Sequence, residues 1–178
     1  MINHYPDLFP RKKPVKRTVN KAVLFVLGRA LQSLSKTDPL IRKETASWPE
    51  GLSLVMNILP NGGSLAVKRQ PDKSLKYLGT KFPIDQADVA IHINDVESAF
   101  KMFTGQLGSD VAYAWHAISA RGDLSYTVSV VRVINVVEAY LFPRIISSKL
   151  MKETPPIPGW RLHLMRLKTY TLGILFGI

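Results

Sequence analysis

The chain has 178 residues, enough for one domain with extensions, and its hydrophobic content of 46% excludes a disordered chain. It contains no cysteine, which excludes disulfides, thiolate metal sites and cysteine nucleophiles and is consistent with a reducing compartment. Its formal net charge of +11 is concentrated at the ends, because residues 1–36 carry +7, residues 143–178 carry +5, and the segment between them carries −1.

Basic ends indicate an anionic partner, which is either nucleic acid or a membrane surface. Proteins that bind single-stranded nucleic acid place aromatic residues among the basic ones. Here the basic residues lie beside long aliphatic runs instead, AVLFVLGRALQSL after RKKPVKR and LKTYTLGILFGI after RLHLMR. This pattern favours an anionic lipid surface. We therefore expect a peripheral membrane protein on the cytoplasmic or organelle matrix side, with no nucleic-acid partner.

A basic arm and an amphipathic helix are expected in residues 1–48. Prolines spaced along the arm predict an extended chain, and Thr18 is the expected N-cap of a helix from Val19 to about Leu34. Arg29 interrupts the apolar run, which disfavours a signal peptide, and the run is too short to span a bilayer. The helix can pack on the domain, lie in the plane of a membrane or cover a binding cavity, and the sequence leaves these alternatives open.

A second, short helix is expected to begin at Pro39, with Asp38 or Thr37 as its cap, and to end before Pro49. The domain itself is expected to cover residues 49–142.

Alternation of apolar and polar residues in this domain predicts five strands. The turn sequences NGG and PDK separate the first three, and the first strand is expected to have only one side facing the core. The strands are expected near residues 52–58, 65–69, 75–77, 89–93 and 118–121.

Two helices are expected between the last two strands. The first follows Asn94 or Asp95 as N-cap, has Glu97 in the position of a capping-box partner, and stops at Gly105. The second covers residues 110–116.

A final helix is expected from Leu124 to about Tyr140, with Asp123 as its N-cap. This prediction conflicts with local propensity, because TVSVVRVINVV is rich in β-branched residues that favour strands. The elements together predict an α+β fold, in which a five-stranded, largely antiparallel sheet is covered on one face by helices and flanked by helical N- and C-terminal extensions.

The segments ADVAIHIND, FKMFTGQLGSDVAYAW and AISARGDLSYTVSVVRVI follow one another in an order and spacing that resembles the sterol carrier protein type 2 family. The resemblance spans residues 51–140 and implies an apolar tunnel for sterols, fatty acyl chains or isoprenoids. Trp115, His116 and Ala117 replace the small and basic residues usual before the last strand, which bears on the size of the tunnel. The N-terminal helix and the GDL segment also resemble accessory proteins of bacterial ubiquinone biosynthesis.

The expected ligand-binding residues are the inward-facing apolar positions of the domain. An acyl, sterol or isoprenoid-quinone tail held there would gain affinity from buried apolar surface, on the order of 25 cal/mol per Å². Each position also fits an ordinary core residue. The positions are Leu54, Met56, Val89, Ile91, Phe100, Phe103, Trp115, Ile118, Leu124, Val128 and Val131.

Residues 143–178 are expected to form a basic extension, interrupted by the prolines of ETPPIPG and ending in an apolar tail. The tail from Thr169 onward would be about 15 Å long as a helix, too short to span a bilayer. It can enter a membrane interface, or fold back on the domain as an extra strand or a plug. The expected membrane-binding residues of the two extensions are Arg11, Lys12, Lys13, Lys16, Arg17, Trp160, Arg161 and Arg166.

No motif for catalysis or metal binding is recognisable. The four histidines lack metal-ligand spacing, there is no glycine-rich phosphate loop or GxSxG motif, and Asp123 is explained as an N-cap. We therefore expect a non-catalytic lipid-binding protein with no metal and no cofactor other than a bound lipid or isoprenoid quinone, docked on an anionic membrane or a membrane protein complex. The alternative is a structural or accessory subunit of a membrane protein complex, which is built on the same domain and binds through its basic apolar tails.

Overall fold

The structure, a computed structural model, describes residues 13–142 and the separate residues 159, 163, 166, 167, 170 and 171. The predictions for residues 1–12 and for most of residues 143–178 lie outside this part of the chain. The described elements are α1 (Pro14–Thr37), α2 (Pro39–Thr45), β1 (Ser53–Ile58), β2 (Gly63–Arg69), β3 (Leu75–Gly79), a 3-10 turn η1 (Ile84–Gln86), β4 (Val89–Ile93), α3 (Val96–Phe103), α4 (Ser109–Ala114), β5 (Ile118–Arg121) and α5 (Leu124–Leu141).

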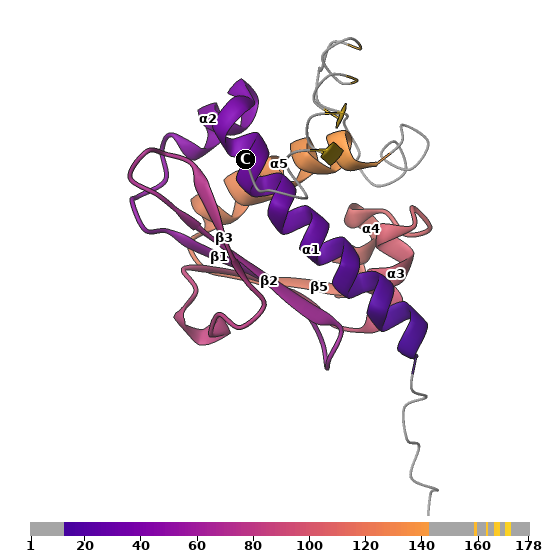
Figure 1. Ribbon diagram of the computed structural model, residues 1–178. Helices are drawn as coiled ribbons and strands as arrows, with labels where there is room; N and C mark the ends of the chain where they lie inside the picture. The colour runs from indigo at the N-terminus through magenta and orange to yellow at the C-terminus, as the bar shows by residue number, and fades with distance from the viewer. Residues whose placement is uncertain (1–12, 143–158, 160–162, 164–165, 168–169, 172–178) are drawn as a thin grey trace, which may run out of the picture.

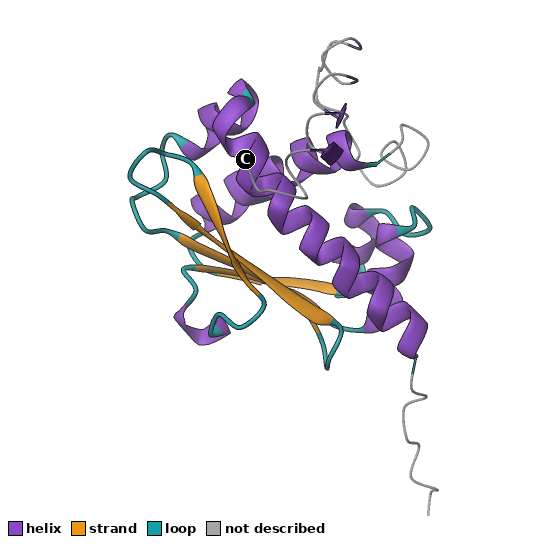
Figure 2. Ribbon diagram, in the orientation of Figure 1, coloured by secondary structure: helices purple, strands orange, loops and turns teal. Residues whose placement is uncertain are grey.

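The five strands form one mixed sheet in the order β3-β2-β1-β4-β5 (Figures 1 and 2). Neighbouring strands are antiparallel except for β1 and β4, which are parallel and place Leu54 beside Val89 and Met56 beside Ile91. The α+β fold and the largely antiparallel sheet predicted from the sequence are confirmed.

Helix α1 lies across the sheet and shares its core (Figure 1). Its residues Leu24, Leu27, Leu31 and Leu34 are at most 2% exposed. Full burial of a leucine side chain contributes roughly 1.5–3 kcal/mol to the stability of the fold. This one face therefore holds the helix on the domain. Of the alternatives left open by the sequence, the structure shows the N-terminal helix packed on the domain.

The start of α1 differs from the prediction. The helix begins at Pro14 and not at Val19, and the Thr18 hydroxyl donates a hydrogen bond of 3.1 Å to the Pro14 carbonyl from within the first turns. Proline is compatible with the first helical position because the N–H that it lacks would have no partner there. The prediction that the prolines of the arm are uniformly extended is therefore wrong at Pro14.

Aspartates cap three of the helices, as predicted. The Asp38 carboxylate accepts hydrogen bonds from the first turn of α2, and Asp123 does the same for α5. Asp95 caps α3, but its partner is Ser98, and Glu97 is not the capping-box residue. Glu97 lies one residue too early for that role and pairs with lysines of α1 instead.

Strand β1 is buried on both faces, whereas the sequence predicted one exposed side. It is the central strand of the sheet, and the segment around η1 passes over the face that the helices leave open. The Arg121 guanidinium fixes this segment by donating a hydrogen bond of 2.7 Å to the Ile84 carbonyl. The alternation rule fails here because it assumes that one face of a strand meets water.

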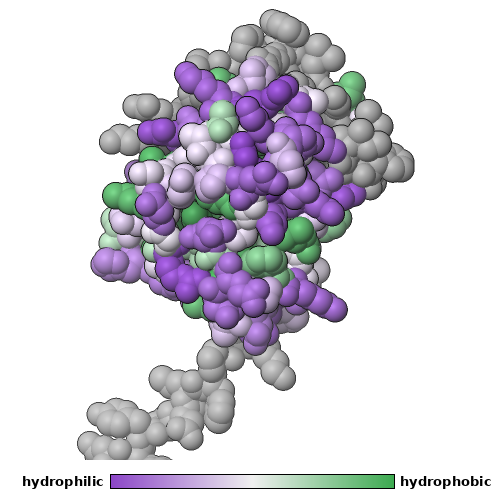
Figure 3. Space-filling view, turned by 90° about the vertical axis from the view of Figure 1, so that its left-hand side faces the viewer, coloured by the Kyte–Doolittle hydropathy of each residue, from purple (hydrophilic) through white to green (hydrophobic). Residues whose placement is uncertain are grey.

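Within the described residues, α5 alone has the length and the mean hydropathy, 1.3, of a membrane-crossing helix, and half of it is buried inside the protein. The face of the molecule at the left of Figure 1 is mostly hydrophilic, with small separate hydrophobic patches (Figure 3).

Candidate functional site

The predicted ligand-binding positions separate into buried and exposed groups. Leu54, Met56, Val89, Ile91 and Phe103 lie in the main core and are at most 6% exposed, while Phe100 and Ile118 are partly buried. The exposed group consists of Trp115 (72% exposed), Leu124 (77%), Val128 (42%) and Val131 (43%). The expectation that all of them face inward is wrong for these four, and contact of any of the eleven with a ligand stays a prediction.

Three of the exposed residues form a row on α5. Leu124, Val128 and Val131 follow the spacing of one helix face, which continues to Asn135 and Glu138. We call these five residues the α5 stripe. It runs about 21 Å along the helix from its apolar to its polar end.

The opposite side of α5 explains why this segment is helical in spite of its β-branched residues. Val130, Val133 and Val137 are completely buried in the main core, and Tyr140 is buried one turn further on. Packing of this face, together with the Asp123 cap, outweighs a helix propensity deficit of at most about 0.7 kcal/mol per residue. The helix thus presents one apolar face to the core and a second one to the surface.

Strand β5 is only partly covered on the side of the sheet that carries the helices. Ala120 pairs with Ile91 and Ile118 pairs with Ile93, so the side chains of each pair point to the same face. Ile91 and Ile93 are buried in the core, whereas Ala120 is exposed and Ile118 only partly buried. The turn at Gly122 joins this partly covered strand directly to the apolar end of the α5 stripe.

Helix α4 lies at the other end of α5, since Ala112 packs in one small cluster with Ala139 and with the partly buried Phe142. Around it the side chains of Tyr113 (68% exposed) and Trp115 (72%) project from the surface. Exposed apolar and aromatic side chains are therefore found on β5, α4 and α5, which follow one another in the chain.

Glu138 is the acidic residue of the α5 stripe. It is partly buried, and burial raises the pKa of its carboxyl to about 7. A carboxyl group with this pKa is about half protonated at neutral pH, so it can both donate and accept hydrogen bonds. With the Asn135 amide one turn away, it gives the apolar stripe a polar end.

Two basic residues at the start of α1 form ion pairs with another residue of the chain at the surface. The ammonium groups of Lys13 and Lys16 each lie 2.6 Å from a carboxylate oxygen of Glu97, and these contacts lower the pKa of Glu97 to about 2. The Lys16 ammonium also lies 5.0 Å from the centre of the Phe100 ring. Arg17 is partly buried, and its Nε has no hydrogen-bond partner.

Arg166 is also used within the chain. Its guanidinium donates hydrogen bonds to the carbonyls of Ala139, Tyr140 and Phe142, at 2.5 to 3.1 Å, and so satisfies the free carbonyls at the end of α5. The Tyr170 hydroxyl donates to the Leu141 carbonyl beside it. The other predicted membrane-binding residues, Arg11, Lys12, Trp160 and Arg161, lie outside the described residues.

The described part of the chain has no group of three or more histidine and acidic side chains that could hold a metal ion. Two polar residues of these sites, Asn57 and Glu138, were not among the candidates predicted from the sequence. Each could have been noticed as a lone polar residue in an apolar element, SLVMNI for the strand and NVVEAYL for the helix.

No family model matches the sequence, and no curated protein matches it either. Several solved structures do match. The chain is similar in structure to sterol carrier protein type 2 domains. The UbiJ-SCP2 ubiquinone synthesis protein matches with 15% identity and a TM-score of 0.44 over 70% of this chain and 100% of its own. Sterol carrier protein domain 2 of Helicoverpa armigera matches with 17% identity and a TM-score of 0.42, over 72% of this chain and 94% of its own. A conserved hypothetical protein from Thermus thermophilus matches with 15% identity and a TM-score of 0.42, over 75% of this chain and 90% of its own.

Proposed function

We propose that the protein binds a lipid with a long apolar tail, on the α5 stripe and the partly covered face of β5, and that it carries out no reaction on this lipid. One observation carries the proposal. Leu124, Val128 and Val131 are 42–77% exposed in a row on a helix whose other side is core. Covering three such side chains with an acyl or isoprenoid chain is worth on the order of 2–5 kcal/mol.

The polar end of the stripe suits the head of such a lipid. Asn135 and the Glu138 carboxyl offer hydrogen-bond donors and acceptors, and Glu138 lies about 21 Å along the helix from Leu124. This length suits the extended tail of an acyl, sterol or isoprenoid-quinone lipid. The tail would contact apolar residues while the head group would meet the polar residues of the stripe.

We further propose that the lipid is collected at an anionic membrane, on its cytoplasmic or organelle matrix side. The basic ends of the chain, with net charges of +7 and +5, would be attracted to anionic head groups. The exposed side chains of Tyr113 and Trp115 suit the membrane interface, where aromatic rings with a polar edge are favoured. Lys13 and Lys16 would take part only in competition with Glu97.

The test is native mass spectrometry of the purified full-length chain, followed by solvent extraction and identification of the lipid. We expect one lipid per chain. Titration with a fluorescent acyl probe then compares the wild type with the triple variant Leu124→Gln, Val128→Gln, Val131→Gln. Because these residues are exposed, the variant should fold normally and lose about tenfold or more in probe affinity.

The matched control is Val15→Gln, which changes a residue that is 73% exposed on α1, outside the stripe. It should bind the probe as the wild type does. A wild-type protein that is purified empty and takes up no probe, or a folded triple variant that binds the probe normally, would contradict the proposal.

A further inference from the structure

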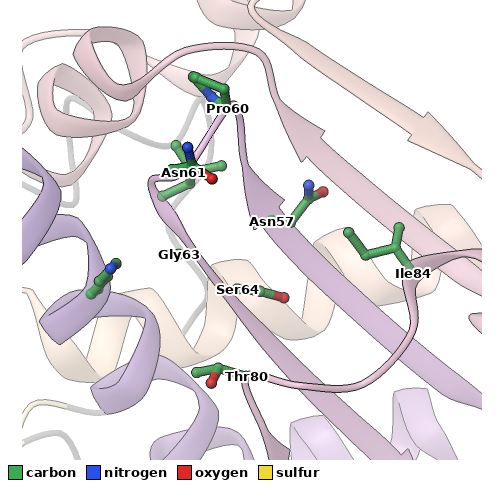
Figure 4. Close-up of a pocket in the computed structure, with 9 residues that line it drawn as sticks. Asn57, Pro60, Asn61, Gly63, Ser64, Thr80 and Ile84 are labelled. Atoms are coloured by element: carbon green, nitrogen blue, oxygen red, sulfur yellow. The ribbon is translucent and has the colours of Figure 1, made fainter.

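A cavity of about 420 Å³ lies at the turn between β1 and β2 (Figure 4), and no residue of α5 lines it. Its polar lining consists of Asn57 from β1, Asn61 from the turn, Ser64 from β2, Thr80 after β3, and Lys21 from α1. Asn57 alternates along β1 with Met56 and Ile58, which face the helices, so its side chain lies on the opposite face of the sheet.

The Asn57 amide is the unusual member of this lining. Asn57 is only 5% exposed, and its Oδ1 accepts no hydrogen bond. A buried amide oxygen that accepts no hydrogen bond destabilises a fold, and an apolar residue would suit a central strand better. Its strand neighbours on the same face are also polar, Ser64 on one side and His92 on the other. The amide oxygen therefore lies among polar side chains but accepts a hydrogen bond from none of them.

The unpaired amide oxygen of Asn57 restricts the chemistry of a ligand. An asparagine side chain has one acceptor oxygen and one donor nitrogen, so a hydroxyl group of a ligand, which can both donate and accept, satisfies it in either orientation. The hydroxyls of Ser64 and Thr80 can serve either role.

The charge of the cavity points to an anion. Lys21 is exposed and lies against Gly63, since a Cβ on that glycine would lie 2.8 Å from the Lys21 Cγ. None of the nine residues that line the cavity is acidic, so no lining carboxylate neutralises the ammonium group. Phosphate oxygens combine a negative charge with several acceptors and are common partners of lysine.

We propose that this cavity binds a phosphate monoester that carries a free hydroxyl group, with Lys21 on the phosphate and Asn57 on the hydroxyl. The site is separate from the lipid surface on α5, and the proposal does not depend on the proposed function. The ester can be a soluble metabolite or the head group of a lipid, because both present the same atoms.

The first experiment is isothermal titration calorimetry of the full-length protein with glycerol 3-phosphate at low salt. We expect Lys21→Gln and Asn57→Leu each to weaken binding about tenfold, the effect of losing one hydrogen bond or charge contact of this kind. The control is Lys43→Gln, an exposed lysine of α2 outside the cavity, which should bind as the wild type does.

Thermal unfolding provides a second readout. If the Asn57 amide is kept for binding, Asn57→Leu should weaken ligand binding and leave the melting temperature unchanged or raised, because the unpaired buried amide oxygen is gone. Glycerol 3-phosphate should also raise the melting temperature of the wild type and not that of Asn57→Leu.

Vesicles distinguish the two sources of the ester. If it is a lipid head group, Lys21→Gln weakens binding to phosphatidic acid vesicles and not to phosphatidylglycerol vesicles; if it is a soluble metabolite, Lys21→Gln weakens binding of glycerol 3-phosphate alone. Either result supports the site. Failure of the wild type to bind glycerol 3-phosphate and phosphatidic acid, or equal binding by all four proteins, would mean that the cavity holds only water and would overturn the proposal.

Discussion

The Tyr140 hydroxyl of α5 donates a hydrogen bond of 2.6 Å to the carboxylate of Asp38, and both residues are completely buried. Asp38 caps α2 with its other carboxylate oxygen, so one side chain holds the start of α2 and a point near the end of α5. A second contact links α5 to the segment after α2, the hydrogen bond of 2.8 Å from the Trp48 indole to the Ser129 hydroxyl. Helix α5 is thus fixed from behind while its stripe faces outward.

Removal of the Tyr140 hydroxyl should destabilise the fold. In Tyr140→Phe the buried Asp38 carboxylate loses a donor, and we expect the free energy of unfolding to fall by about 1.5–3 kcal/mol. Urea denaturation followed by circular dichroism measures this change. Tyr126→Phe, on the same helix at a partly buried position, should change stability little, and equal losses in the two variants would count against a special role for the Asp38 contact.

Gly122 is required by the turn that leads from β5 into α5. It has a φ of +132°, and an added Cβ would lie 2.4 Å from the Asp88 carbonyl oxygen. Gly122→Ala should therefore destabilise the protein by about 2–4 kcal/mol, through backbone strain and a backbone clash together. Gly79 has a φ of +86° with no atom near its Cβ position. Gly79→Ala should therefore be destabilised by backbone strain alone, about 1 kcal/mol. Thermal unfolding of both variants measures these changes. An equal loss of stability in Gly79→Ala and Gly122→Ala would refute this explanation.

Stability should depend on pH through Glu138. Its pKa is about 7 in the folded protein against 4.5 ordinarily, so the folded state holds this proton more tightly than the unfolded state. The contribution of Glu138 to the free energy of unfolding is complete below pH 4.5, decreases as the pH rises toward 7, and is lost above that. Since one pKa unit corresponds to about 1.4 kcal/mol, the loss is about 3 kcal/mol at most for this partly buried group.

Replacement by glutamine tests the assignment. Glu138→Gln cannot ionise, so its denaturation curves should show a smaller decrease in stability between about pH 5 and 8, and it should be more stable than the wild type at the upper end of this range. Parallel pH profiles of the two proteins would show that Glu138 is not the group responsible.

Most of the framework was predictable because local signals and packing agree. Each of the five strands carries its own alternating pattern and turn residues, and Asp38, Asp95 and Asp123 each precede a helix that they cap. The helix α5 was predicted against its β-branched composition from the Asp123 cap and the apolar spacing. These features are determined by neighbours in the chain, which a sequence displays directly.

The candidate sites were less predictable because they depend on what covers each face. Leu124 and Val130 are both apolar residues of α5, and only the packing of α1, α2 and the sheet decides that one is exposed and the other buried. The cavity at Asn57 needs the η1 segment to pass over the sheet, and no periodicity in the sequence indicates that crossing.

The ion pairs at the start of α1 provide a last prediction, on membrane binding. Glu97 holds Lys13 and Lys16 at 2.6 Å, and with a pKa of about 2 it stays ionised at any pH where the protein would meet a membrane. In Glu97→Gln both ammonium groups lose this partner and become available to anionic head groups. If these lysines help to dock the protein, Glu97→Gln should bind phosphatidylglycerol vesicles more tightly than the wild type, and the gain in affinity should shrink at high salt because the contact is electrostatic.

Vesicle co-sedimentation measures this affinity. The control for the change in net charge is Glu50→Gln, which removes an acidic residue distant from α1 in the chain. Equal gains in the two variants would reduce the effect to net charge, and no gain in Glu97→Gln would exclude Lys13 and Lys16 from the membrane contact.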